Sequence, residues 1–164
     1  MKAIYALEGG LAGAVALTLI HETIKRAIPG APRLDLLGIQ VVSKGVKAFK
    51  AKQPKERALY GMALTGELIS NAIYYSLSGI GGSKGAVAKG AALGLGAGLS
   101  AVILPDKIGL SGQNTNRNIE TKILTVGLYV LGGIIASLVL KKLDKRKKNQ
   151  HQEWQNRLVT SSQA

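Results

Sequence analysis

The chain of 164 residues contains no cysteine and is poor in aromatic and acidic side chains. Without a thiol it can form no disulfide, no thiolate zinc site and no cysteine nucleophile. Aromatic residues make up only 4% of the chain, and 9 Asp and Glu face 22 Lys and Arg, which gives a formal net charge of +13. The aromatic residues do not alternate with the basic clusters as a base-stacking platform would require. We therefore expect no nucleic-acid partner.

Apolar and small residues are abundant, with 46% in the apolar set and 21 glycines. A basic chain this apolar must keep charge and apolarity in separate segments, which is typical of a membrane protein and not of a disordered chain. Four stretches are long and apolar enough to cross a hydrocarbon core of about 30 Å. They are residues 3–24, 58–80, 86–104 and 123–140.

These stretches predict an all-α, polytopic membrane domain over residues 1–140, with a basic loop at 25–57. A basic, then polar, flexible tail is expected at residues 141–164. A soluble helical bundle is less favoured, because the last two stretches lack a polar face. A cleaved signal peptide is less favoured for the first stretch, because Glu8 interrupts it and no cleavage site follows Ile20.

The two basic segments would face opposite sides of the membrane if all four stretches span it. Because the excess of Lys and Arg then points both ways, it does not predict an orientation. A re-entrant third stretch would remove the conflict and remains an alternative. Within the basic loop, residues 34–49 are compatible with an interfacial helix.

Glycines recur at every fourth position in two of the stretches. They are Gly9 and Gly13 in the first, and Gly90, Gly94 and Gly98 in the third. This spacing lines one helix face and lets two backbones approach closely in lipid. We expect the third stretch to be the central packing helix, against the first stretch or against a second copy. The similar motifs at 9–13 and 94–98 also suggest an internal repeat of two helical hairpins.

The second stretch carries an acid near its middle. Glu67, Asn71 and Tyr74 follow one another on a single helix face and form a polar stripe. An acid near the bilayer midplane should face other helices or a wet cavity, because its insertion into lipid is costly. The stripe is either a set of hydrogen bonds between helices or a site that lines a path.

Other ionisable groups lie nearer the ends of the stretches. Glu8 and Lys89 sit at similar depths if the first and third stretches run in the same direction, which predicts an ion pair. His21 and Glu22 end the first stretch and are expected at the membrane interface. They begin a zincin-like helix motif that lacks its second histidine.

We find no phosphate-binding loop, no Gly-x-Ser-x-Gly elbow and no calcium loop. The sequence therefore predicts no catalytic residue, no metal site and no cofactor. Anionic lipid headgroups are the expected partners of the basic loop and tail.

Four segments together resemble a group of small bacterial four-helix inner-membrane proteins and are similar to the YagU-like family, whose function is unknown. These segments are residues 9–13, 31–38 (APRLDLLG), 66–77 (GELISNAIYYSL) and 104–110 (LPDKIGL). The resemblance implies a multi-pass protein of the bacterial inner membrane and carries over no catalytic residue.

Three functions follow as hypotheses. The first is a non-catalytic helix-packing protein, either a homo-oligomer or an accessory subunit of a membrane complex. The alternative is a small channel or proton-coupled transporter that uses Glu67. The third is an enzyme acting on lipid.

Overall fold

The computed structural model describes residues 3–161, with side chains to residue 158. The chain is 83% helical and has no strand among the described residues, so the predicted all-α fold is confirmed. The elements are α1 (Ala3–Ala27), α2 (Leu34–Ala48), α3 (Glu56–Ser76), the 3-10 turn η1 (Leu77–Gly79), α4 (Ala86–Lys107), α5 (Gln113–Asn116) and α6 (Ile119–Ser161).

Three of these helices, α1, α4 and α6, are long and apolar enough to cross a membrane, which suggests a multi-pass membrane protein. The predicted span at 58–80 does form a helix, α3, but α3 is not among the three. It carries Glu56, Arg57 and Glu67 among glycine and hydroxyl residues, and this composition lowers its hydropathy. α4 runs unbroken for 22 residues.

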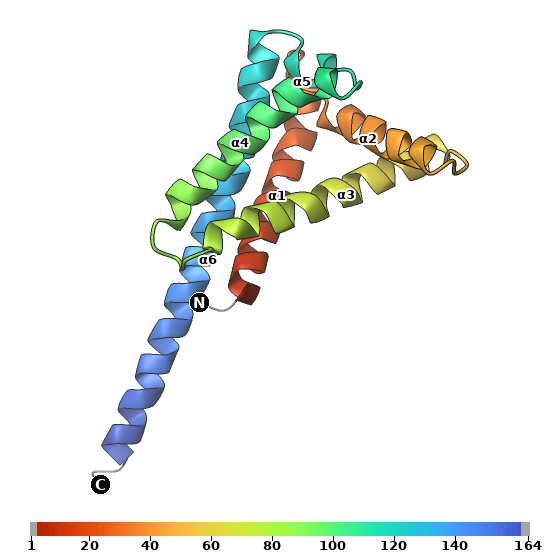
Figure 1. The fold of residues 1–164 in the computed structure, drawn as a ribbon. Helices are drawn as coiled ribbons and strands as arrows, with labels where there is room; N and C mark the ends of the chain where they lie inside the picture. The colour runs from red at the N-terminus through yellow and green to blue at the C-terminus, as the bar shows by residue number, and fades with distance from the viewer. Residues whose placement is uncertain (1–2, 162–164) are drawn as a thin grey trace.

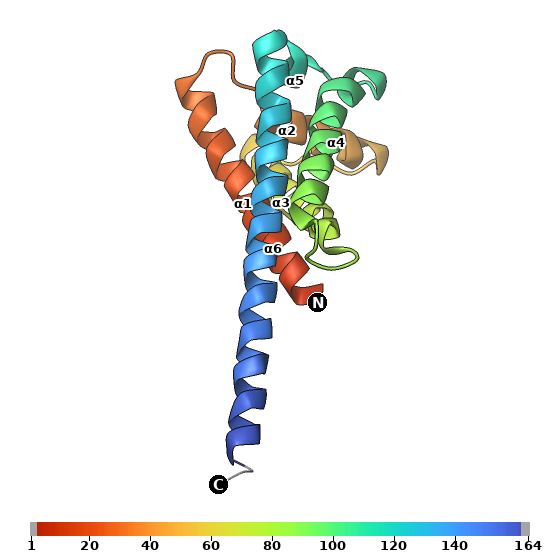
Figure 2. The ribbon, with the colours of Figure 1, turned by 90° about the vertical axis from the view of Figure 1, so that its left-hand side faces the viewer.

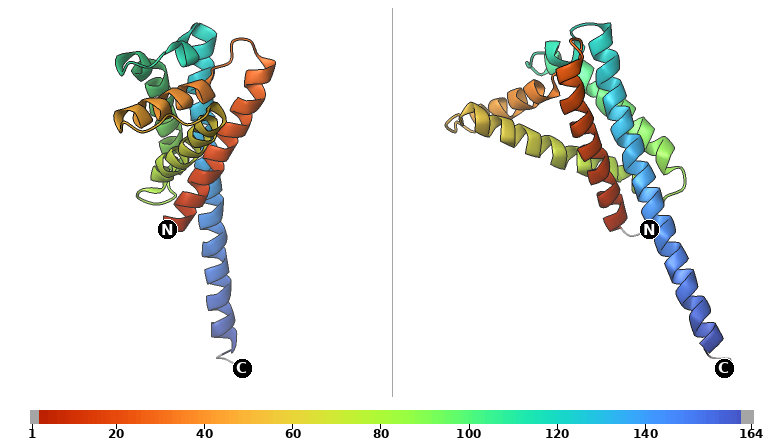
Figure 3. Two further views of the ribbon diagram at one scale, coloured as in Figure 1. Left: turned by 90° about the vertical axis from the view of Figure 1, so that its right-hand side faces the viewer. Right: turned by 180° about the vertical axis from the view of Figure 1, so that it is seen from behind.

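The three apolar helices form a bundle with α6 in the middle (Figure 2). α1 and α4 run in the same direction on either side of α6, which runs the opposite way (Figure 1). α2 and α3 make a hairpin that projects sideways from the bundle, and α3 crosses α1 obliquely on its way back (Figure 3). The hairpin thus returns the chain to the end of the bundle where α1 begins.

The glycines flagged in the sequence lie where helices touch. A Cβ at Gly9 would lie 2.5 Å from the Ala136 carbonyl oxygen, and one at Gly13 would lie 2.4 Å from that of Gly132, both in α6. Gly90, Gly94 and Gly98 of α4 also face α6, with atoms of that helix 2.7 Å or less from each Cβ position. The third stretch is therefore not the central helix. Both glycine faces are occupied by α6 of the same chain.

The turn after α4 depends on a glycine of positive φ. Gly109 has φ +69°, and the following Leu110 donates its N–H to the Pro105 carbonyl at 2.8 Å. This pattern is a Schellman motif, in which a left-handed glycine lets the chain satisfy the last free carbonyls of a helix. It ends α4 sharply and sends the chain into α5.

The tail expected to be flexible at 141–164 instead continues α6 as far as residue 161, and residues 162–164 lie outside the described residues. The helix extends over 43 residues, about 64 Å at the usual rise, which is twice the thickness of a hydrocarbon core. Its Lys-, Arg- and Gln-rich composition suits a helix, because these side chains lose little freedom there. The part of α6 from Lys141 to Leu158, here called the α6 extension, projects beyond the bundle (Figure 1).

Candidate functional site

Glu67 lies in the middle of α3 and points toward α2. It lines a cavity of about 370 Å³ between these two helices, whose other walls are mostly apolar, including Leu37, Val41 and Ala63. Among the described residues, three buried side-chain oxygens have no hydrogen-bond partner, and Glu67 Oε1 is the only one that belongs to an ionisable group. A buried carboxyl group in apolar surroundings without a partner is costly unless it takes up a proton or binds something.

The other two residues of the predicted stripe, Asn71 and Tyr74, make different contacts. Asn71 is buried one turn further along α3 and lines the Glu67 cavity together with Tyr129 of α6. Both also line a second cavity, of about 310 Å³, on the α4 side. The Tyr74 hydroxyl instead donates to the Leu93 carbonyl in α4 at 3.1 Å. Glu67 and Asn71 therefore share one cavity, whereas Tyr74 joins α3 to α4.

His21 is buried within the protein, with 1% of its surface accessible. Its Nε2 lies 3.1 Å from the Pro32 carbonyl oxygen and 3.3 Å from the Leu34 amide nitrogen. Nε2 donates to the carbonyl when it carries a proton and accepts from the amide when it does not. The burial arises because residues 28–33 turn the chain back, so that the start of α2 covers the end of α1.

Glu22 lies beside His21 within a cluster of charges that the sequence reading did not identify. Its carboxylate accepts hydrogen bonds from Lys25 and from the Tyr60 hydroxyl of α3, the latter at 3.2 Å. Lys25 also donates to Asp35 at 3.1 Å, and Arg33 donates to Asp35 through two nitrogens at 3.0 Å. Lys25 thus joins acids from α1 and α2 (Glu22 and Asp35).

Asp35 is the most firmly held acid of this cluster. Lys25 and Arg33 together donate three hydrogen bonds to its carboxylate, which stabilise the charged form. The same contact raises the pKa of Arg33 above its ordinary value. Asp35 is therefore ionised at neutral pH. The spacing of Glu22 and Lys25 at i and i+3 is a sequence signal that could have pointed to part of this cluster.

A small cavity lies between the charge cluster and Glu67. It measures about 10 Å³ and is lined by side chains from α1, α2 and α3: His21, Glu22, Asp35, Tyr60, Ala63, Leu64 and Glu67. Glu67 thus faces two spaces, the larger apolar cavity on one side and this small polar one on the other.

The predicted ion pair between Glu8 and Lys89 does not form. Glu8 is exposed, and the Lys89 ammonium donates to the Ile80 carbonyl at 2.5 Å. The physical reason is that the α6 helix lies between the α1 and α4 helices (Figure 2). The expectation that these two helices run in the same direction is met, but they do not face each other.

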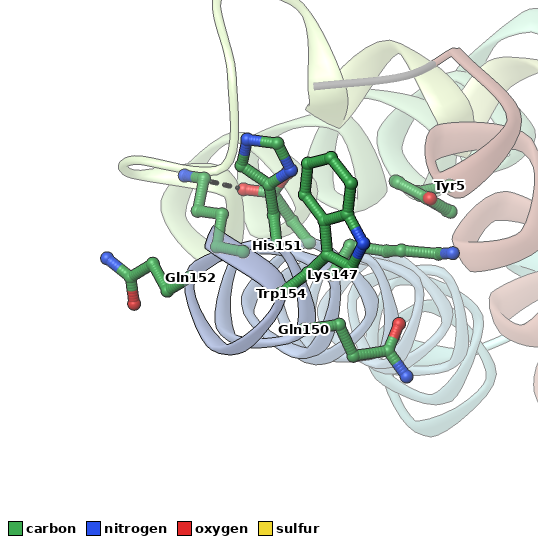
Figure 4. Close-up of a pocket in the computed structure, with 8 residues that line it drawn as sticks. Tyr5, Lys147, Gln150, His151, Gln152 and Trp154 are labelled. Atoms are coloured by element: carbon green, nitrogen blue, oxygen red, sulfur yellow. Dashed lines mark ion pairs between the residues drawn. The ribbon is translucent and has the colours of Figure 1, made fainter. Parts of the chain in front are cut away.

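A groove of about 790 Å³ lies between the start of α1 and the α6 extension. Figure 4 shows Tyr5 of α1 across from Lys147, with the rings of His151 and Trp154 side by side. The ring centroids of His151 and Trp154 are 6.3 Å apart, and Lys148 pairs with Asp144 at 3.0 Å. The groove is far along the bundle from Glu67.

Comparisons with known proteins give this site no precedent. No protein-family model, curated protein or solved structure matches the chain. The resemblance to the YagU-like family stays a prediction, and the candidate site is defined by its own residues: Glu67 and Asn71 at the larger cavity, and Glu22, Lys25, Arg33, Asp35 and Tyr60 beside the smaller one.

Proposed function

We propose that the chain crosses the membrane four times, with α2 and α3 making one crossing together. The directions of the apolar helices support this proposal. α1 and α4 run the same way, so the chain between them must return to the side where α1 begins (Figure 1). The resemblance stated above favours the inner membrane of a bacterium. The α6 extension is then the basic segment available to anionic headgroups.

We infer that the protein is a small, non-catalytic channel or proton-coupled transporter that uses Glu67. The observation that carries this inference is the buried Glu67 carboxyl oxygen, which lacks a hydrogen-bond partner among the described residues and lies between two cavities. Insertion scales put the cost of a charged side chain at the helix centre at about 2.5–3.5 kcal/mol. Such groups mark ion and proton pathways in membrane proteins.

The packing of the glycine faces favours this function over assembly with a second copy. Gly90, Gly94 and Gly98 were the best reason to expect a homo-oligomer. They contact α6 of their own chain instead, and a second copy has no access to them.

The experiment compares proton flux into liposomes that contain the full-length protein. A pH-sensitive dye inside the liposomes reports the flux under an imposed membrane potential. We expect wild-type protein to exceed protein-free liposomes and Glu67→Gln to fall to the protein-free level. Glu8→Gln is the matched control, because Glu8 is an exposed acid on α1, and it should match wild type. Equal flux in Glu67→Gln and wild type, or no wild-type flux, would contradict the proposal.

A second candidate is an accessory subunit that holds a soluble partner. The α6 extension favours it, because this segment projects beyond the bundle and exposes Trp154 and Leu158. A chain cut after Leu143 should then lose its partner in a cross-linking experiment on intact membranes. The liposome flux of the same truncated chain should be unchanged.

A further inference from the structure

The small cavity beside Glu67 has the size of a single water site. A cavity needs about 10–15 Å³ of probe-occupied volume to hold one water, which must also find two to four polar partners. The cavity measures about 10 Å³ and has carboxyl and hydroxyl groups in its wall. It therefore has room for one water and the chemistry to bind it.

The polar groups of this wall are not equally occupied. Asp35 accepts hydrogen bonds from both Lys25 and Arg33 and has little capacity left. The Tyr60 hydroxyl donates a hydrogen bond to Glu22, and the tyrosine oxygen can still accept one. Glu67 Oε1 is buried and accepts nothing from the described residues. A water in this cavity would donate one hydrogen bond to Glu67 Oε1. It would form a second hydrogen bond with Glu22 or Tyr60, as donor or as acceptor.

The two glutamates differ in their access to solvent. The Glu22 side chain is 22% exposed, at the end of α1 where the chain turns into α2. Glu67 Oε1 is buried from solvent, and the residue lies in the middle of α3. A proton from solvent can therefore reach Glu22 directly, whereas it reaches Glu67 Oε1 through one of the two cavities that Glu67 lines.

We propose that one water in this cavity relays protons between Glu22 and Glu67, which makes Glu22 the residue through which Glu67 exchanges protons with solvent. This proposal rests on the proposed function, because it describes how a proton reaches the same Glu67.

The step balances as a transfer of one proton. The Glu22 carboxylate first takes up a proton from solvent. That proton moves to the oxygen of the water, and a proton on the far side of the water moves to Glu67 Oε1. Glu22 ends as a carboxylate, Glu67 as a neutral acid, and the water is restored. No electron moves and no further reactant is needed.

Other charged and titratable groups face Glu67, and each has a different role. Asp35 of α2 already accepts three hydrogen bonds from Lys25 and Arg33 and so is not part of the relay. His21 of α1 has Nε2 against backbone groups of residues 32 and 34, and its Nδ1 lies 3.9 Å from Glu22. Lys25 of α1 stabilises the Glu22 carboxylate after the transfer. Tyr129 of α6 lines the larger cavity, on the other side of Glu67.

Time-resolved infrared spectroscopy on the full-length protein in liposomes tests the relay. The carboxyl band of protonated Glu67 is identified as the band that Glu67→Gln removes. Its rise is then followed after a rapid release of protons from a caged acid. Glu22→Gln should slow the rise about a hundredfold, the lower end of what a positioned proton-transfer group supplies. Glu22→Asp should restore much of the rate, because it keeps the carboxyl group.

Tyr60→Phe is the second variant, because it keeps the ring and removes only the hydroxyl that holds the water. In this variant the Glu67 band should rise more slowly, by a smaller factor, and reach the same final height. A purely structural role of Tyr60 would change the height and the rate together. Glu8→Gln is again the control and should behave as wild type.

The outcomes separate the relay from the proposed function. Equal rates in wild type, Glu22→Gln and Tyr60→Phe would overturn the relay, even if liposome flux still depended on Glu67. No Glu67 band at any pH would also overturn it. A band slowed by Glu22→Gln, together with flux that does not depend on Glu67, would support the relay and contradict transport.

Discussion

At Gly94 the backbones of α4 and α6 touch. A Cβ built there would lie 2.4 Å from the Tyr129 carbonyl oxygen and 2.6 Å from Val130 Cα. Neither atom belongs to a flexible side chain, so the two helices would have to move apart. In lipid, close packing of this kind replaces the hydrophobic effect as the force that associates helices.

Gly94→Ala should therefore destabilise the bundle by about 1–3 kcal/mol, the usual cost of overpacking. Gly127→Ala on α6 is the control, because no atom lies within 4 Å of its Cβ position. The free energy of unfolding in mixed detergent micelles measures both. Similar values for the two variants would contradict the helix contact.

Asp35 is the residue whose charge should matter most to stability. Asp35→Asn leaves Lys25, only 12% exposed, without one of its two acids, and breaking a buried ion pair costs about 3–5 kcal/mol. Arg33→Gln should cost less, because Arg33 is 46% exposed and its charge can return to water. Detergent unfolding of both variants checks this order, and a larger loss in Arg33→Gln would contradict it.

At the scale of elements, α6 departs most from the expectation. The sequence predicts the end of the last span near Leu140, where the apolar run stops and lysines begin. The helix does not end there, because no glycine or proline interrupts residues 141–161 and the composition favours helix. Apolar periodicity marks the part of a helix that packs, and it carries no information on where an exposed helix stops.

Asn149→Pro should separate the α6 extension from the bundle. A proline in a helix interior costs about 3 kcal/mol, enough to break an exposed segment that packs on little else. Circular dichroism should show a loss of helix relative to Asn149→Ala. The unfolding temperature of the bundle should stay the same. A parallel fall in that temperature would mean that the extension stabilises the bundle.

At the scale of the whole molecule, the proposed four crossings place the two ends of the bundle on opposite sides of the membrane. The loop between η1 and α4 and the α6 extension then lie on one side, and the turns after α1 and before α6 lie on the other (Figure 1). The absence of native cysteine makes this simple to test, because each introduced cysteine is the only thiol.

Single cysteines at Lys84 and Asn149 should react from the same side of sealed vesicles with a membrane-impermeant maleimide. Cysteines at Ile28 and Asn118 should react from the opposite side. Labelling of Lys84→Cys and Asn149→Cys from opposite sides would contradict four crossings. A vesicle sample opened with detergent controls for reactivity that burial alone prevents.

Part of this architecture could be predicted from the sequence. Helix positions follow from the long apolar runs, and contacts at Gly9 and Gly94 follow from four-residue spacing, because both signals are local. The partner of those glycines is not local, since several helices carry small residues. The cluster around Asp35 was missed for the same reason: it forms only when residues 28–33 fold α2 back over α1.

In the proposed function, Glu67 takes up a proton in the mostly apolar cavity between α2 and α3, inside the membrane. A lipid-soluble carbodiimide such as dicyclohexylcarbodiimide tests it most directly, because it reacts with protonated carboxyl groups in apolar surroundings. Mass spectrometry of the labelled full-length protein in liposomes should find the adduct on Glu67 and not on Glu8, with labelling that falls as the pH rises. An unlabelled Glu67, or equal labelling of Glu8, would contradict the claim.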